Sequence, residues 1–229
     1  MLVLALDTAT SAMIAGLVRL APAHEPAGAP QVVAERATET TRAHAELLMP
    51  SVRGMLASAG VPMRDLDAVV CGAGPGPFTG LRVGMVTAAA LGDALDIPVY
   101  PVVSLDAIAH RAGGDSPLLV ITDARRREVY WARYDCDPGK GCVRVDGPHV
   151  GRPDELPLEG VARVAGAAER LTCPARPPVV PPRHPDPAAL AALAAARVRS
   201  HAPPAPLTPL YLRRPDAEEP GPRKLVIPA

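Results

Sequence analysis

The chain twice starts a stretch of structure in the same way, with an apolar strand that ends in a carboxylate and then reverses direction. Residues 2–7 read LVLALD, and residues 118–123 read LLVITD. Each is followed by a short polar turn and a second apolar or alternating run, which is the pattern of a β-hairpin. Helices and strands are expected to alternate between the two hairpins. This order predicts an α/β protein, and the echo indicates either a duplicated lobe or a coincidence.

Hydrophobic periodicity places the remaining elements along the chain. We expect strands over residues 2–6, 13–18, 31–38, 66–72, 96–102, 118–123 and 129–135, and a strand with a following turn or helix over 161–171. We expect helices over residues 41–59, 79–91, 104–113 and 187–200. Thr41 and Thr79 are the expected N-caps of the first two helices. Pro50 is expected to kink or split the first helix, and Pro187 suits the first turn of the last.

The bulk composition is that of an ordinary folded protein. Of 229 residues, 48% are hydrophobic and 21% charged, and the formal net charge is +0. The apolar runs fall short of the roughly 18 residues of a transmembrane helix. Asp7 ends the apolar run at residues 2–6, so we interpret this run as a buried strand and not as a secretion signal. We therefore expect a cytoplasmic protein. The net charge of zero argues against a protein that binds nucleic acid strongly on its own.

The four cysteines are expected to be free thiols. They are Cys71, Cys136, Cys142 and Cys173, and none belongs to a CxxC pair. Their spacing therefore argues against a zinc site. Disulfides are rare in the cytosol, which favours the reduced state.

A loop rich in glycine and proline follows the strand at 66–72 and precedes a helix. Residues 71–84 read CGAGPGPFTGLRVG. A Walker loop needs lysine and a hydroxyl residue after its last glycine, but Leu81 and Arg82 follow Gly80. A dinucleotide-binding fingerprint needs glycine at the place that Pro77 occupies. The glycines therefore serve close packing of strand and helix, the favoured interpretation, or leave amides open to an anion.

The helix after this loop carries small residues at every fourth position, Gly80, Gly84, Ala88 and Gly92. Glycine inside a helix lowers its stability by roughly 1 kcal/mol relative to alanine. Favourable packing on this flat face must compensate for that loss. We expect close contact with a partner's helix or with the helix at 41–59. Phe78, the single phenylalanine, is interpreted as a partner anchor or as a buried plug.

Four segments together resemble the TsaB (YeaZ) family: AGPGPFTGLRVG, IPVYPVVSLDAIA, TDARRREVYWARY and PLYLRR. The resemblance covers about residues 1–135 and resumes near Leu210. It implies a two-lobed, actin-like and Hsp70-like (ASKHA) α/β fold, with mixed sheets flanked by helices. The expected N-terminal lobe is 1–103, the C-terminal lobe with a Pro-rich connector 104–215, and a flexible tail 216–229.

The resemblance also implies a role in tRNA N6-threonylcarbamoyladenosine biosynthesis as a non-catalytic scaffold or activator of a TsaD-type catalytic subunit. A TsaE-type ATPase would join, and tRNA would be reached through the complex. No catalytic residue, metal or cofactor of its own is expected, since ATP and a metal belong to the partner complex. A homodimer of the lone chain is left open, and no membrane contact is expected. The candidate interface residues are Phe78, Thr79, Gly80, Arg82, Val83, Gly84, Thr87, Ala88, Leu91, His44, Leu48 and Val52.

The sequence departs from the catalytic relatives at the metal site. The catalytic paralogue carries a pair of histidines after the corresponding strand, whereas Ser104 to Ala107 contain none and the next histidine is His110. One distant imidazole does not make a metal site. We interpret His110 and His44 as ordinary surface or helix histidines.

Nucleotide binding is also disfavoured, because actin-like ATPases follow each carboxylate with glycine. Here Thr8 follows Asp7, and Ala124 follows Asp123. We expect both aspartates to cap hairpin turns and not to hold magnesium or a nucleotide. The secondary candidates for a nucleotide or anion are Asp7, Thr8, Gly74, Gly76 and Asp123.

Two basic runs are Arg125 to Arg127 and Arg213 to Arg214. They are interpreted as solvated turns, with contact to tRNA or to an acidic partner surface as the alternative. The rival functions are an actin-like ATPase or small-molecule kinase and, with no support from any assembled constellation, a peptidase.

Overall fold

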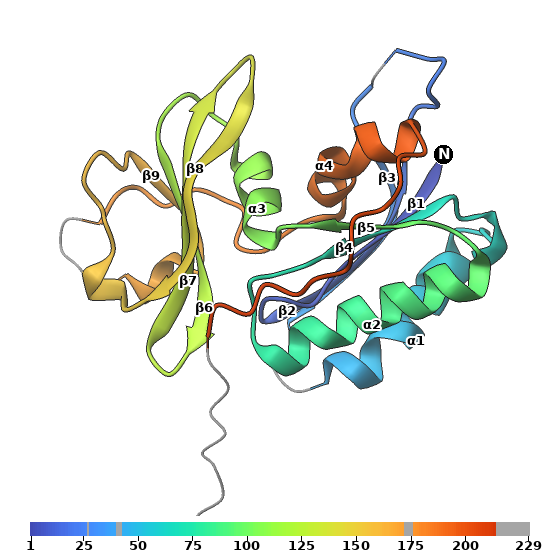
Figure 1. Cartoon of the computed structure of the whole chain (residues 1–229), viewed down its shortest axis with the longest axis horizontal. Coiled ribbons are helices and arrows are strands. Elements are labelled where there is room, and N and C mark those ends of the chain that lie inside the picture. The colour runs from blue at the N-terminus through green and yellow to red at the C-terminus, as the bar shows by residue number, and fades with distance from the viewer. Residues whose placement is uncertain (27, 40–42, 172–175, 214–229) are drawn as a thin grey trace, which may run out of the picture.

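The computed structural model describes residues 1–26, 28–39, 43–171 and 176–213, which form two lobes that lie side by side (Figure 1). Each lobe is built on its own mixed sheet, with strand orders β3-β2-β1-β4-β5 and β8-β7-β6-β9. The first sheet comprises β1 (Leu2–Asp7), β2 (Ala12–Arg19), β3 (Gln31–Glu39), β4 (Ala68–Gly72) and β5 (Val99–Val102). The second comprises β6 (Leu118–Arg125), β7 (Glu128–Asp137), β8 (Gly141–Gly151) and β9 (Arg163–Gly166). The predicted α/β class with two mixed sheets is confirmed.

The two sheets repeat one pattern of strand directions. In the first, β1 pairs antiparallel with β2 and parallel with β4, and β2 pairs antiparallel with β3. In the second, β6 pairs antiparallel with β7 and parallel with β9, and β7 pairs antiparallel with β8. The echo between LVLALD and LLVITD therefore corresponds to equivalent strands, β1 and β6, of two lobes with the same core topology.

Helices cover both faces of the first sheet. One face packs against α1 (His44–Ser58) and α2 (Phe78–Leu95). The other packs against α4 (Pro187–Arg199), whose alanines lie on β1 and β4. Because both faces are covered, β4 is buried along its whole length, as its unbroken apolar sequence predicts. In the second lobe α3 (Ser104–Ala112) packs against β6 and β8.

The placement of α4 corrects the predicted division into lobes. The range 104–215 assigned α4 to the second lobe, but the helix packs on the first sheet (Figure 1). A side chain at Gly16 of β2 would collide with Pro187, so this glycine lets the start of α4 approach the strand. The chain after α4 then returns to the junction, where the Leu210 amide donates to the Ala73 carbonyl at 3.0 Å. The predicted tail, 216–229, lies outside the described residues.

The helix ends differ from prediction in two places, both on α2. Pro77, and not Thr79, is the N-cap of α2, and no side chain of the described ranges caps this helix start. This helix also runs beyond Leu91, to Leu95. Helix α1 continues through Pro50 without splitting, and its expected cap, Thr41, lies outside the described residues. No helix among the described residues is both long and apolar enough to cross a bilayer.

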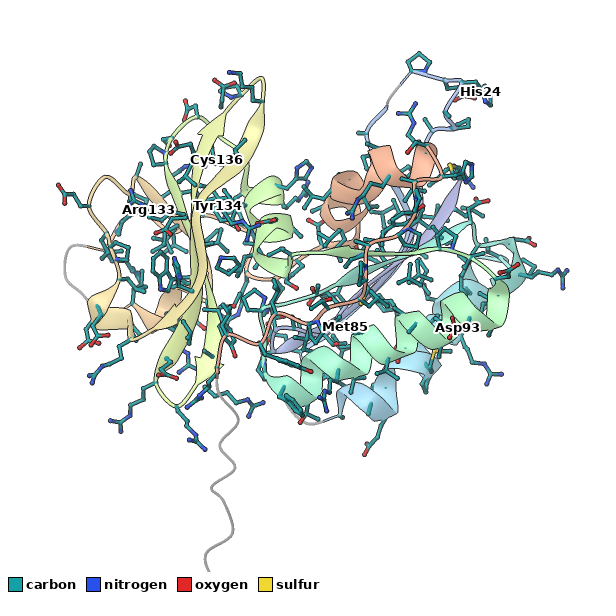
Figure 2. All side chains as sticks on the ribbon, viewed as in Figure 1. His24, Met85, Asp93, Arg133, Tyr134 and Cys136 are labelled. Atoms are coloured by element: carbon teal, nitrogen blue, oxygen red, sulfur yellow. A yellow bond between two sulfur atoms is a disulfide. The ribbon has the colours of Figure 1, made fainter. Side chains whose placement is uncertain are left out.

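The expectation of free thiols is wrong for two cysteines. Cys136 and Cys142 form a disulfide, because the register of β7 and β8 places them directly opposite each other. Figure 2 shows Cys136 near Tyr134 on this lobe, away from Met85 and Asp93 on α2. Cys71 is free and buried, and Cys173 lies outside the described residues. Strand β8 was not predicted, so its pairing with β7 could not be foreseen.

Candidate functional site at the junction of the lobes

Asp7 lies fully buried where β1, the glycine loop and α3 meet. Its Oδ1 accepts a hydrogen bond from the Ala9 amide at 2.8 Å, and its Oδ2 accepts one from Ser104 Oγ at 2.5 Å. Ser104 Oγ in turn accepts from the Gly74 amide at 3.3 Å. Burial raises the pKa of Asp7 to about 6, although both hydrogen bonds oppose the rise. The predicted turn cap is confirmed, and the same carboxylate also joins the two lobes.

Asp123 occupies the equivalent place in the second lobe but has different surroundings. Its Oδ1 accepts from the Arg125 amide at 2.9 Å, which confirms the predicted turn cap. Its Oδ2 lies 2.7 Å from Arg170 Nη2, in a partly exposed ion pair. The two aspartates are thus both hairpin caps, and only Asp7 belongs to the buried network.

The glycines of the loop make room for the β1–β2 turn. A side chain at Gly72 would collide with the Asp7 carboxylate, and one at Gly76 with Ala9. Thr8 Oγ1 donates to the Gly80 carbonyl at 2.7 Å and accepts from the Gly84 amide at 2.9 Å. The packing interpretation of these glycines is therefore confirmed.

The expected neighbour of the small-residue face was wrong, however. A side chain at Gly84 would strike Thr8, and one at Gly92 would strike Val99, so the face packs on its own lobe and not on another helix. Five interface candidates are consequently covered inside the first lobe, because their side chains or backbone lie in its core: Gly84, Ala88, Leu91, Leu48 and Val52.

Other interface candidates remain accessible. Phe78 is 49% exposed, so the interpretation as a buried plug is wrong. Thr79 and Arg82 are exposed, and Gly80, Val83 and Thr87 are half-buried. Sequence reasoning missed Val86 of α2, which is 65% exposed, and Leu47 of α1, which is 37% exposed. Both are adjacent to buried positions in the helical pattern, and that spacing was the signal available for finding them.

The secondary anion candidates are mostly occupied by internal contacts. Both carboxylate oxygens of Asp7 accept hydrogen bonds, the Thr8 hydroxyl both donates and accepts, and the Gly74 amide donates to Ser104. Within the described residues no three histidine, cysteine or acidic side chains gather as metal ligands would.

His44 lies in a helix, at the start of α1, as one of the two expected alternatives has it, but it is not a surface histidine. Its side chain is buried, and among the described residues Nε2 has no hydrogen-bond partner. Burial is the main cause that lowers the pKa of His44 below its usual value. The ring borders a cavity of about 540 Å³, whose wall also includes Thr8, Thr79 and Asp123. His110, in contrast, is exposed on α3.

Comparison with known proteins assigns the chain to a family. Residues 31–141 match the family model "TsaD: tRNA N6-adenosine threonylcarbamoyltransferase". An uncharacterized protein of Mycobacterium tuberculosis H37Rv is 53% identical over 216 residues, which are 94% of this chain and 93% of that protein. The tRNA threonylcarbamoyladenosine biosynthesis protein TsaB of Bacillus subtilis is 34% identical over 143 residues, 61% of this chain and 57% of TsaB. YeaZ from Pseudomonas aeruginosa superimposes with a TM-score of 0.71 and 30% identity, covering 92% of this chain and 99% of YeaZ. With its two actin-like lobes and its glycine loop packed on the first hairpin turn, the chain belongs to the TsaB (YeaZ) family.

Proposed function

We propose that this chain is a non-catalytic scaffold or activator subunit in tRNA N6-threonylcarbamoyladenosine biosynthesis, acting in the cytoplasm. Its named relatives, the TsaB proteins, support the pathway. Membership of the TsaB family supports a TsaD-type partner, and the match to a TsaD model over residues 31–141 is consistent with a partner of related fold. A TsaE-type ATPase and tRNA complete the proposed assembly.

The observation that carries this proposal is an exposed apolar surface on α1 and α2. We define the α1/α2 outer surface by Leu47, Gly54 and Val86. Val86 is 65% exposed and Leu47 37%, and a methyl group added at Gly54 would meet no atom of the described residues within 4 Å outside the adjacent backbone of its own helix. The two helices contact each other, and large apolar side chains left exposed on neighbouring elements favour a protein interface. The catalytic subunit is therefore proposed to dock here, on the outside of the helices.

The absence of catalysis is proposed from the surroundings of Asp7. An actin-like ATPase or kinase needs this carboxylate and the adjacent backbone open to phosphate and metal. In this chain both carboxylate oxygens accept internal hydrogen bonds, and Thr8 and Ala9 follow where glycine would be needed. ATP and metal are consequently proposed to act in the partner subunits. Robust ATP hydrolysis by the purified chain alone would favour the rival function.

The test is reconstitution with the partner subunits, tRNA, threonine, bicarbonate and ATP. We expect tRNA modification only when this chain and the TsaD-type subunit are both present. Val86→Glu should weaken capture of that subunit about tenfold or more, since it places a charge at the centre of an apolar interface. Val145→Glu is the matched control, because Val145 is 55% exposed on the other lobe. Equal capture by both variants would reject the α1/α2 outer surface.

A further inference from the structure

Two aromatic rings and a guanidinium form an exposed stack at the junction of the lobes. Phe78, at the start of α2, and Tyr211, in the segment after α4, have ring centroids 5.0 Å apart. The Arg82 guanidinium lies 3.8 Å from the centre of the Phe78 ring, and Arg82 Nε donates to Tyr211 Oη at 2.6 Å. Tyr211 is 39% exposed. Flat groups of this kind offer a ready surface for another planar group.

The segment that carries Tyr211 is held by both lobes. On one side the Leu210 amide donates to the Ala73 carbonyl of the first lobe. On the other, Arg213 donates to the Ala124 carbonyl of the second lobe at 3.2 Å and lies 3.4 Å from Glu128. These contacts fix Tyr211 against Phe78, so the stack exists before any ligand arrives.

A cavity of about 750 Å³ opens beside the stack. Its wall contains Phe78 and Tyr211 together with Tyr130, whose hydroxyl donates to the Gly76 carbonyl at 3.3 Å across the junction. Arg126 and Arg213 also border it. A hollow of this size, with aromatic walls and cationic edges, suits a flat ligand that carries negative charge.

The β6–β7 turn, whose Arg125 and Arg126 border this cavity, has a disfavoured backbone conformation. Arg125, Arg126 and Arg127 have φ angles of 62°, 50° and 64°. The two central residues of such a turn are usually asparagine and glycine, which adopt positive φ with less strain. Backbone strain of this kind concentrates where function requires it. The strained turn therefore favours a binding role for this edge of the cavity.

We propose that this junction binds single-stranded RNA directly. We define the aromatic–arginine patch by Phe78, Arg82, Arg126, Tyr211 and Arg213, together with Arg127, which follows Arg126 in the β6–β7 turn without lining the cavity. Unpaired bases stack on aromatic and guanidinium planes, and arginines alongside neutralise phosphates, which is how proteins hold single strands. A protein partner would suit the apolar α1/α2 outer surface better than this charged and hollowed one. The inference rests on the proposed function for its RNA, an unpaired loop of the tRNA.

The test uses the full-length protein and a fluorescein-labelled anticodon stem-loop RNA from a tRNA that reads codons beginning with A. Fluorescence anisotropy should show Tyr211→Ala weakening the affinity about fivefold or more, while Tyr211→Phe stays within about twofold because the ring remains. Joint replacement Arg126→Gln and Arg127→Gln should reduce the slope of log affinity against log salt by about 1.4, if each arginine meets one phosphate. Arg152→Gln is the matched control, an exposed arginine of the same lobe.

The outcomes separate this inference from the proposed function. Capture of the TsaD-type subunit is measured for every variant, and the RNA titration is repeated with the complex. Loss of RNA affinity with normal capture supports the patch. Unchanged RNA affinity in Tyr211→Ala, or no RNA binding by wild type alone and in the complex, overturns it. Loss of capture with unchanged RNA affinity also overturns it and assigns the patch to a protein. Failure of wild type to capture the subunit refutes only the proposed function.

Discussion

Replacement of Asp7 by asparagine should change how the stability of the protein depends on pH. The buried carboxyl of Asp7 has its pKa raised from 3.8 to about 6, with desolvation as the main cause. A raised pKa means that the folded state binds the proton more tightly than the unfolded state. Folding therefore gains stability from Asp7 as pH falls through 6, and the gain is complete below 3.8.

The size of the effect follows from the same shift. With about 1.4 kcal/mol per pKa unit, the full gain is about 3 kcal/mol, of which about 1.4 kcal/mol is present at pH 5. The asparagine side chain cannot take up this proton but keeps an oxygen for the Ala9 amide. The unfolding free energy of wild type, relative to Asp7→Asn, should therefore rise by about 1.4 kcal/mol between pH 7 and pH 5.

The assay is urea unfolding of both proteins at pH 7, 6 and 5, with the free energy extrapolated to water. Asp93→Asn, which removes an exposed carboxylate of α2, is the control for the loss of one charge. A difference between wild type and Asp7→Asn that stays constant across this range would refute the reasoning. So would a difference of opposite sign, in which wild type weakens relative to the variant as pH falls.

Four further substitutions test packing and cross-links within the fold. Ser104→Ala removes a hydrogen bond that lowers the pKa of Asp7, so NMR titration of that carboxyl should give a value above that of wild type. Gly84→Leu should lower the free energy of unfolding by about 3 kcal/mol or prevent folding, since the new side chain meets Thr8. An unchanged melting curve would contradict this. Gly54→Ala, in open space, should raise the free energy of unfolding by up to about 1 kcal/mol. Cys142→Ser should lower the unfolding free energy by about 2 kcal/mol, as a disulfide closing so short a loop predicts, and reduction of wild type should match it.

Elements with a strong local signal were predicted closely. Strands β1 and β6, helix α3 and the Pro187 start of α4 all follow from hydrophobic runs, periodicity and turn residues. Strand β8 was missed because it lies at a sheet edge, where Gly147 and Pro148 interrupt its alternation. Without β8, the facing positions of Cys136 and Cys142 had no signal in the sequence.

Some contacts of the candidate site could likewise be predicted from the sequence, and others could not. That Asp7 and Asp123 cap their turns could be predicted, since each accepts from an amide two residues ahead. That the glycines allow neighbouring elements to pack closely could also be predicted. That Thr8 supplies this contact to Gly84 could not, because the two residues are 76 positions apart in the chain. Exposure of Val86 and Tyr211 likewise depends on which helix or segment covers each face.

By itself the sequence determined the local elements: the two strand–carboxylate hairpins, the helices and the glycine-rich stretch at which other residues pack closely. These depend on side-chain period and backbone freedom, which neighbouring residues specify. Only the tertiary structure decided which surfaces meet, and hence that Asp7 is enclosed by Ser104, that α4 covers the first sheet and that Tyr211 stacks on Phe78. Contacts between residues distant in the chain arise from the joint packing of whole elements, and no local pattern encodes them.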